Sequence, residues 1–333
     1  MAFNLLLFGI FLKFLIITDA QSVGVCNGRV GNNLPSPQAV VNLYRANGIT
    51  RMRIYDPHAA TLQALSGTNI ELILDVPNSY LENLNNPTAA TNWVRDNILS
   101  YPNVRFRYIA VGNEVDPNNP NTRRYVPFVL PAMRNVQNAL RAVGNPLKVS
   151  TATYTGLLKV SYPPSDGVFH DNVVGFIRPI ITFLAQNGSP MLANIYPYFA
   201  HVGPPKLSDL SFALFTRSTQ AYNDNGRDYF NLFDAMYDAH YAAQARLGGA
   251  NVGIVVSESG WPSGGGDAAT RDVATLENAG TYYRNLIRHV KERRRIETYL
   301  FAMFDENMKH GKETEQHFGV FSPSQQSKYQ LRF

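Results

Sequence analysis

Cysteine is almost absent from this sequence. Cys26 is the single cysteine among 333 residues, so no disulfide can form within the chain. Charged residues are also scarce, at 17%, whereas 45% of the residues are apolar, which is enough to bury a large core. We therefore expect the packing of that core to hold the fold, with Cys26 inside a buried strand.

Patterns that bind phosphates, metals or nucleic acids are missing too. The glycine run at residues 264–266 follows Trp-Pro, and no helix with phosphate-binding spacing begins there. The formal net charge is +5, and we interpret the one dense basic run, residues 293–295, as the solvated end of a helix. The histidines show no paired ligand spacing, and we expect four of them at the surface or at helix caps: His201, His240, His289 and His310. The sequence therefore predicts no cofactor, no metal and no nucleic-acid partner.

The apolar N-terminus is too short and too interrupted for a membrane span. Residues 5–17 are apolar apart from Lys13, and the small residue Ala20 precedes Gln21, which is typical of a secretory signal peptide. We expect residues 1–20 to be removed and residues 21–333 to form a single domain, secreted without a membrane anchor. Asn187 begins a glycosylation sequon, but Pro190 directly after that sequon leaves its modification open.

The rest of the chain alternates between strand and helix patterns. Short apolar runs predict strands at residues 23–26, 50–55, 71–76, 106–111, 148–153, 191–195, 252–257 and 298–303. Helical patterns lie between them, at residues 39–47, 59–65, 87–99, 125–143, 171–186 and 274–292, with two more inside residues 199–249. This order predicts an α/β fold, a (β/α)₈ TIM barrel in which residues 199–249 elaborate the sixth βα unit. An open doubly wound sheet is the alternative.

Carboxylates stand where predicted barrel strands end. Glu114 follows the fourth strand and Glu258 ends the seventh, so a barrel would place both at the carboxyl-terminal face, where catalytic groups belong. Two carboxyl groups across a cleft are what glycosidic bond cleavage needs, one protonated and one ionised. Glu306, Lys309 and Glu315 follow the eighth strand, and taken alone this cluster is equally consistent with a structural network of salt bridges.

Residues 255–264, Val-Val-Ser-Glu-Ser-Gly-Trp-Pro-Ser-Gly, resemble the hallmark of plant family 17 glycoside hydrolases, the β-1,3-glucan endohydrolases. Further motifs of that family match in order at residues 24–26, 32–35, 53–57, 111–114, 194–199, 301–307 and 314–319. Two positions depart from the family pattern. Asn27 stands where a tyrosine is usual, and Met308 where a glutamine is usual, which bears on the binding of sugar units and not on the two acids.

The resemblance implies a (β/α)₈ barrel and a retaining double displacement, with Glu258 as nucleophile and Glu114 as general acid/base. It implies auxiliary charged residues at Glu306, Lys309 and Glu315, and a hydrogen bond from Asn113 to a sugar hydroxyl. Four aromatic residues would line the groove: Tyr55, Tyr196, Phe199 and Trp261. Retention requires the two carboxyl groups to lie roughly 5–5.5 Å apart, and we expect the charge of Glu258 to be the main cause of a raised Glu114 pKa.

The expected substrate is a β-1,3-glucan, either fungal wall glucan or callose, and the expected role is in plant defence or callose turnover. A mixed-linkage β-1,3-1,4-glucan hydrolase could use the same catalytic pair, and a non-catalytic glucan-binding defence protein is the alternative from another class. We expect a monomer. Family members sent to the vacuole carry a C-terminal extension that is not seen after Phe333, so we expect an extracellular or cell-wall location, with the vacuole as the alternative.

Overall fold

The computed structural model describes residues 23–203 and 208–333. The expected signal peptide therefore lies outside the described residues. Within the described part of the chain, no helix is both long and apolar enough to cross a bilayer.

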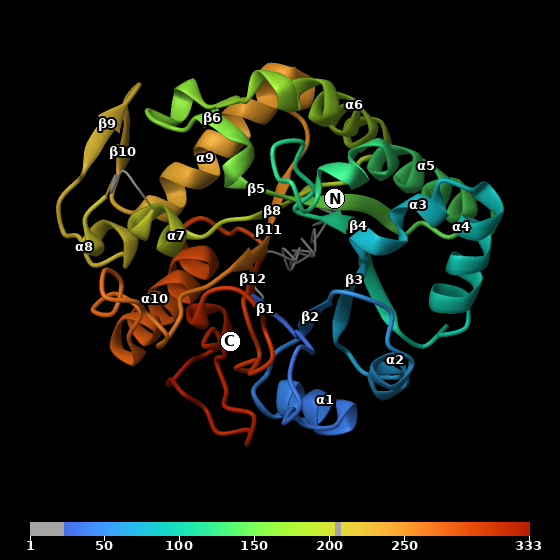
Figure 1. The fold of residues 1–333 in the computed structure, drawn as a ribbon, viewed down its shortest axis with the longest axis horizontal. Coiled ribbons are helices and arrows are strands. Elements are labelled where there is room, and N and C mark those ends of the chain that lie inside the picture. The colour runs from blue at the N-terminus through green and yellow to red at the C-terminus, as the bar shows by residue number, and fades with distance from the viewer. Residues whose placement is uncertain (1–22, 204–207) are drawn as a thin grey trace, which may run out of the picture.

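Parallel strands close into a barrel, as the sequence predicts (Figure 1). β1 pairs with both β2 and β12, which completes the ring in the order β1-β12-β11-β8-β5-β4-β3-β2. The strands are β1 (Val23–Cys26), β2 (Arg51–Ile54), β3 (Glu71–Val76), β4 (Arg105–Asn113), β5 (Lys148–Tyr154), β8 (Met191–Asn194), β11 (Ile254–Ser259) and β12 (Thr298–Leu300). β1 and β3 have the predicted bounds, whereas β12 ends at Leu300, before the predicted residue 303.

Helices surround this barrel (Figure 1). They are α1 (Pro37–Ala46), α2 (Ala59–Leu65), α3 (Leu81–Leu84), α4 (Pro87–Val94), α5 (Val126–Ala142), α6 (Asp171–Asn187) and α10 (Leu276–Arg288). α1 begins at Pro37, two residues before the predicted start, because the Ser36 side chain accepts a hydrogen bond from the Ala39 amide and Pro37 occupies the first turn. α6 ends at Gly188, whose φ of 60° gives the left-handed conformation that glycine adopts without strain.

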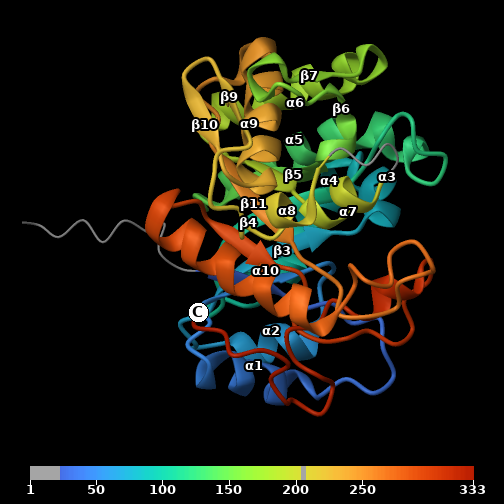
Figure 2. The same cartoon turned by 90° about the vertical axis from the view of Figure 1, so that its left-hand side faces the viewer.

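Two insertions enlarge one side of the barrel. The sixth βα unit contains α7 (Pro197–Val202), α8 (Leu210–Ala213), the hairpin of β9 (Tyr222–Asp224) and β10 (Arg227–Tyr229), and α9 (Leu232–Gln244). This is the elaboration that the sequence predicts over residues 199–249. A second hairpin, β6 (Leu158–Val160) and β7 (Val168–Phe169), follows β5 and was not predicted, because its strands are too short to show a period. The two hairpins and α9 lie on the same side of the barrel (Figure 2).

Charged side chains occupy the barrel interior along β2. Arg51 and Arg53 lie two positions apart on that strand, so their side chains are on the same face, and they are 1% and 0% exposed. Arg51 donates to Glu71, and Arg107 donates to both Glu71, at 3.0 Å, and Glu297, at 2.6 Å. This network fills the amino-terminal end of the barrel. Arg53 lies further along the same strand and faces the carboxyl-terminal end of the barrel.

The histidine prediction is wrong for His201 and His240, which are fully buried. His240 lies on α9, where its ring packs edge-on against Phe169 at 5.6 Å and its Nε2 lies 3.1 Å from Thr153 Oγ1. Its Nδ1 has no hydrogen-bond partner among the described residues. Burial therefore lowers the pKa of His240 to about 4.

This burial predicts a loss of stability in acid. The folded state holds His240 neutral, so its contribution is complete above the unfolded pKa of about 6.5 and is lost as the pH falls towards 4. Between pH 7.5 and 4.5, the wild type is expected to lose roughly 2 kcal/mol more free energy of unfolding than His240→Phe. Urea titrations of both proteins at both pH values measure this difference. Equal losses in the two proteins would show that His240 does not couple to folding.

Candidate active site

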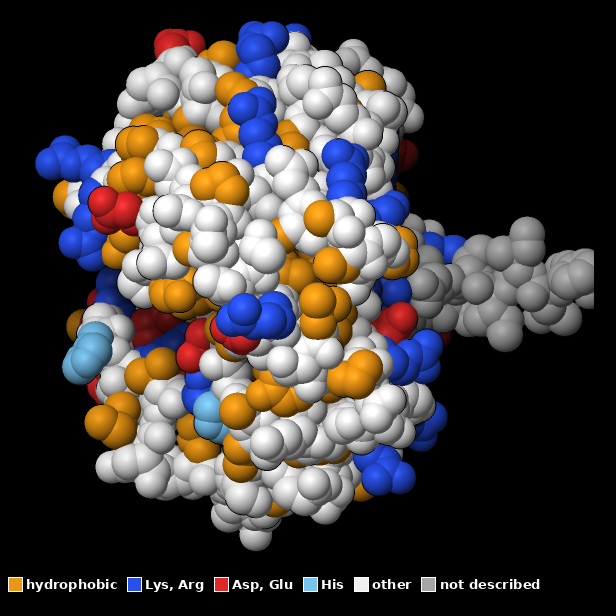
Figure 3. Space-filling view, turned by 90° about the vertical axis from the view of Figure 1, so that its right-hand side faces the viewer, with side chains coloured by type: hydrophobic (Ala, Val, Ile, Leu, Met, Phe, Trp, Pro, Cys, Tyr) orange, Lys and Arg blue, Asp and Glu red, His pale blue; other side chains and the backbone are white. Residues whose placement is uncertain are grey.

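A cleft of about 1380 Å³ opens at the carboxyl-terminal ends of the barrel strands. It is hollowed into the surface, and acidic side chains are visible within the hollow (Figure 3). Nine of the ten site residues that the sequence analysis names line this cleft: Tyr55, Asn113, Glu114, Tyr196, Phe199, Glu258, Glu306, Lys309 and Glu315. The barrel thus brings together side chains that lie more than 250 positions apart in the sequence.

Glu258 lies near the end of β11, where its backbone pairs with Asn194 of β8. The residue is 5% exposed, and its carboxylate accepts hydrogen bonds at both oxygens. Oε1 accepts from Arg53 Nη1 and from the Tyr55 hydroxyl, each at 2.8 Å, and Oε2 accepts from the Tyr196 hydroxyl at 2.5 Å. Three donors therefore fix the orientation of this carboxylate in the cleft floor.

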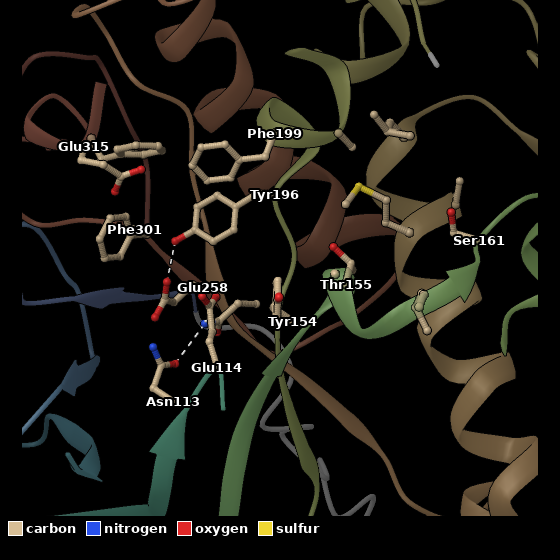
Figure 4. A pocket seen from close by; sticks show the side chains of 18 of the residues that line it. Asn113, Glu114, Tyr154, Thr155, Ser161, Tyr196, Phe199, Glu258, Phe301 and Glu315 are labelled. Atoms are coloured by element: carbon tan, nitrogen blue, oxygen red, sulfur yellow. Dashed lines mark hydrogen bonds between the residues drawn. The ribbon is translucent and has the colours of Figure 1, made fainter. Parts of the chain in front are cut away.

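Glu114 follows β4 in an unusual backbone conformation. Its φ is 51° and that of Gly112 is 82°, both in the left-handed region that a side chain disfavours. Asn78 holds this turn, because its Nδ2 donates to the Asn113 carbonyl and its Oδ1 accepts from the Asn113 amide, both at 2.8 Å. A strained non-glycine residue held in this way is typical of a functional site. The Glu114 side chain lies beside that of Glu258 (Figure 4).

The pKa of Glu114 is raised to about 7. Burial is the largest cause and the negative charge of Glu258 the second, so our expectation that the charge of Glu258 dominates was wrong. Asn194 opposes the rise, because its Nδ2 donates to Glu114 Oε1 at 2.8 Å, and the positive charge of Arg53 opposes it too. A carboxyl group with this pKa carries a proton at mildly acidic pH, which suits a general acid.

Sequence reasoning missed Arg53 as a site residue. Its guanidinium is fully buried and donates to Asp75 through Nε, at 3.1 Å, and through Nη2, at 2.6 Å. The same group contacts Glu258 through Nη1 at 2.8 Å and Asn113 Oδ1 through Nη2 at 2.9 Å. Asn194, also missed, lies 3.2 Å from Nη1 through its Oδ1. A signal was available, since a charge inside a strand predicted to be buried needs a partner.

The auxiliary cluster surrounds Glu306, which is 2% exposed. Its Oε1 accepts from the Val30 amide at 2.8 Å, and Lys309 Nζ lies 3.5 Å from its Oε2. Gly28 packs closely against it, and a Cβ there would come within 2.3 Å of Glu306 Oε1 and displace that carboxylate. Burial raises the pKa of Glu315, and the positive charge of Lys309 opposes that rise.

Trp261 does not line the cleft, so the prediction that it stacks on a sugar ring is wrong. The residue is 0% exposed, and its indole Nε1 donates to the Val273 carbonyl at 2.9 Å. Its ring packs against Tyr198 and Tyr282, at 5.2 and 5.3 Å between ring centroids. Trp261 therefore anchors the loop after β11 to the helical layer.

Other aromatic side chains line the cleft in its place. Figure 4 shows Phe301 near Glu315 on one side and Tyr154 on the other, with Tyr196 and Phe199 between them. The two departures from the family pattern lie outside the cleft lining: Asn27 is buried, and Met308 is exposed.

No group of three or more His, Cys, Asp or Glu residues suited to a metal ion occurs in residues 23–203 or 208–333. In the cleft the Glu114 carboxyl group, with its raised pKa, lies close to the strongly hydrogen-bonded carboxylate of Glu258. Two carboxyl groups in such different environments can act as a proton donor and a nucleophile.

The sequence matches the family model described as glycosyl hydrolases family 17 over residues 23–333. The chain belongs to glycosyl hydrolase family 17. The resemblance seen in its motifs is thereby confirmed, and within this family the chain is a glycosidase.

Two relatives of the chain at more than 50% identity come from plants. It is 56% identical to a glucan endo-1,3-β-glucosidase of Vitis vinifera, covering 98% of this chain and 96% of that protein. It is 53% identical to the acidic isoform GI9 of Nicotiana tabacum, which has the same enzyme name, covering 100% and 97%. Among solved structures it is similar to CJP38, a β-1,3-glucanase and pollen allergen of Cryptomeria japonica. That match has a TM-score of 0.89 and 44% identity, and it covers 94% and 99% of the two chains.

Proposed function

We propose that this protein hydrolyses internal β-1,3-glucosidic bonds of β-1,3-glucans with retention of anomeric configuration. The observation that carries the proposal is the placement of Glu258 and Glu114 in the floor of one long cleft, in contrasting environments. The names of relatives at 56% and 53% identity support the linkage. An open cleft suits attack within a polymer, because a chain can lie across it without presenting an end.

In the first step, Glu258 attacks the anomeric carbon while Glu114 donates its proton to the leaving glycosidic oxygen. A bond forms between the anomeric carbon and a Glu258 oxygen as the bond to the leaving sugar breaks. In the second step, Glu114 takes a proton from water, whose oxygen attacks the same carbon and releases Glu258. Two inversions at one carbon leave the configuration unchanged.

The surrounding residues position the reacting groups. The hydroxyls of Tyr55 and Tyr196 and the guanidinium of Arg53 hold the Glu258 carboxylate in one orientation. Asn113 Oδ1 accepts from Arg53 Nη2 and from Asn194 Nδ2, at 2.9 and 3.1 Å, which fixes the orientation of its amide. The Asn113 Nδ2 is then directed to donate to a sugar hydroxyl near the reacting carbon. Such hydrogen bonds strengthen in the transition state.

The pKa of Glu114 predicts how activity depends on pH. The first step needs the protonated acid, so kcat/KM is high below a pKa of about 7 and falls tenfold per pH unit above it. A profile of kcat/KM on a soluble β-1,3-glucan from pH 4 to 9 measures this decrease at high pH. A rate that stays constant up to pH 9 would contradict the assignment of Glu114 as the acid.

Linkage preference is tested by measuring reducing-sugar release from three polymers in parallel: a linear β-1,3-glucan, a mixed-linkage β-1,3-1,4-glucan and a β-1,4-glucan. We expect rapid release of short oligosaccharides from the first polymer and little from the others. If the protein preferred the mixed-linkage polymer, the assignment of the catalytic site would stand, and the proposed substrate would change. Binding without release from any of them would favour the non-catalytic glucan-binding alternative.

We further propose that the protein is secreted and acts as a monomer, on fungal wall glucan or on callose. The signal-like segment at residues 1–20 supports secretion, and a cleft built by one chain supports a monomer. The vacuole remains the alternative destination, since a relative at 48% identity is the basic vacuolar isoform of Nicotiana plumbaginifolia.

A further inference from the structure

Asn194 ends β8 in the floor of the catalytic cleft, where it is 1% exposed. Its amide makes four hydrogen bonds. Oδ1 accepts from the Ser257 hydroxyl at 2.7 Å and from Arg53 Nη1 at 3.2 Å. Nδ2 donates to Glu114 Oε1 at 2.8 Å and to Asn113 Oδ1 at 3.1 Å. A primary amide has two acceptor and two donor sites, so every site of this amide is used.

The neighbours of the Asn194 amide fix its orientation. A guanidinium has no acceptor atom, so the amide atom that Arg53 contacts must be the oxygen. The other amide atom is then the NH₂ group, which can only donate. Turning the amide over would place its NH₂ group against the Arg53 guanidinium, whose side chain is 0% exposed, and would leave donors facing donors. Asn194 therefore always presents a donor to Glu114.

Ser257 reaches Asn194 because β11 is irregular at this point. The pairing of β11 with β8 shifts register between Val256 and Glu258, so β11 has an extra residue opposite Asn194. In a regular strand, neighbouring side chains point to opposite faces. Here Glu258 lines the cleft, while Ser257, which is 0% exposed, directs its hydroxyl to Asn194. The strand that carries the nucleophile therefore also orients the residue that contacts the acid.

The hydrogen bond from Asn194 distinguishes the two oxygens of Glu114, which lies in the same cleft as Glu258 (Figure 4). Oε1 accepts from the Asn194 NH₂ group. In a protonated carboxyl group the carbonyl oxygen is the better acceptor, so this contact favours a proton on Oε2. Within the described residues, Oε2 has no hydrogen-bond partner in the protein. The proton on Oε2 is therefore available to a bound substrate.

We propose that Asn194, oriented by Ser257, is a positioning residue that keeps the acid proton of Glu114 on Oε2. This inference rests on the proposed function of the cleft. In the first step, the proton passes from Oε2 to the leaving glycosidic oxygen as the glycosidic bond breaks. The hydrogen bond from Asn194 stabilises the Glu114 carboxylate that this transfer leaves. In the second step, the same oxygen takes a proton from the attacking water.

The test compares kcat/KM on two substrates that differ in their need for an acid. A linear β-1,3-glucan oligosaccharide requires protonation of its leaving oxygen, whereas a dinitrophenyl glycoside of the same sugar releases a stable phenolate without it. We expect Asn194→Ala to lose about 10²-fold or more on the oligosaccharide. Its loss on the dinitrophenyl glycoside should be smaller by about tenfold or more.

Tyr196→Phe is the matched control, because it removes a hydrogen bond from the nucleophile and not from the acid. Both substrates need the nucleophile, so the losses of this variant on the two substrates should agree within about threefold. Ser257→Ala removes only the donor that orients Asn194, and it should show the pattern of Asn194→Ala with smaller losses. Ser257→Ala carries the same comparison if Asn194→Ala does not fold.

A pH profile separates the positioning role from a structural one. The hydrogen bond from Asn194 opposes the rise in the Glu114 pKa, so its removal raises that pKa further. In Asn194→Ala the alkaline fall of kcat/KM on the oligosaccharide should move up by about one pH unit. A merely distorted site would lower kcat/KM at every pH and leave the midpoint of that fall unchanged.

Two results would overturn the inference. One is an equal loss on the two substrates in Asn194→Ala, and the other is an unchanged midpoint of the alkaline fall in that variant. Failure of the wild type to cleave the oligosaccharide would instead refute the proposed function.

Discussion

Glu258→Gln is expected to lower kcat/KM on a β-1,3-glucan by about 10⁴-fold or more, because an amide cannot form the glycosyl-enzyme ester. The substitution keeps the shape of the side chain, and Arg53 keeps its pair of contacts with Asp75. The fold should therefore survive, which circular dichroism and urea unfolding verify. Reducing-sugar release under single-turnover and steady-state conditions measures the loss.

The matched control is Glu306→Gln, which makes the same change at another buried carboxylate of the same cleft. Glu306 contacts the Val30 amide and Lys309, and it makes no bond to the substrate in the proposed mechanism. Loss of the negative charge of Glu306 should displace neighbouring groups, and it should lower kcat/KM by no more than about 10²-fold. Glu258→Gln with activity equal to that of Glu306→Gln would contradict the assignment of the nucleophile.

Arg53→Met is expected to lower the free energy of unfolding by about 3–5 kcal/mol. Asp75 and Glu258 are 1% and 5% exposed, and both lose their cationic partner in this variant. The pKa of Asp75 is already raised to about 6 by burial, and Arg53 is what opposes that rise. Without Arg53, two buried carboxylates face each other with no compensating charge, so activity should fall together with stability.

Arg29→Met provides the control, because it removes the same side chain from an exposed ion pair at the cleft rim. Arg29 and Asp56 have side chains that are 30% and 44% exposed, and pairs of this kind contribute about 0–1 kcal/mol. Urea unfolding of both variants at pH 7 separates the two effects. Equal losses in the free energy of unfolding for Arg53→Met and Arg29→Met would show that the buried Arg53 network stabilises the protein no more than an exposed ion pair does.

The barrel was predictable from the sequence because its strands and helices have different apolar periods. The runs at residues 71–76 and 59–65 match β3 and α2 in both bounds. The β6–β7 hairpin was not predictable in this way, because two- and three-residue strands have no measurable period. The placement of Glu114 and Glu258 in one cleft was also predictable, since a charge at the end of a buried strand is unfavourable without a function or a partner.

Three features of the site depend on contacts between distant segments. Arg53 meets Glu258 across 205 positions of sequence, and no local pattern encodes that contact. The direction of a side chain after a strand depends on the turn, so Trp261 points into the helical layer and not into the cleft. The burial that raises the Glu114 pKa comes from the closed cleft floor, whereas a sequence displays only the neighbouring charge.

The central claim, that Glu258 forms a covalent intermediate which water then displaces, is tested most directly by the configuration of the first product. A linear β-1,3-glucan oligosaccharide is mixed with the enzyme, and the anomeric protons are followed by NMR before mutarotation equilibrates them. The account predicts that the β-anomer of the new reducing end appears first and then decays towards equilibrium. Initial appearance of the α-anomer would mean a single inversion, and it would contradict Glu258 as nucleophile.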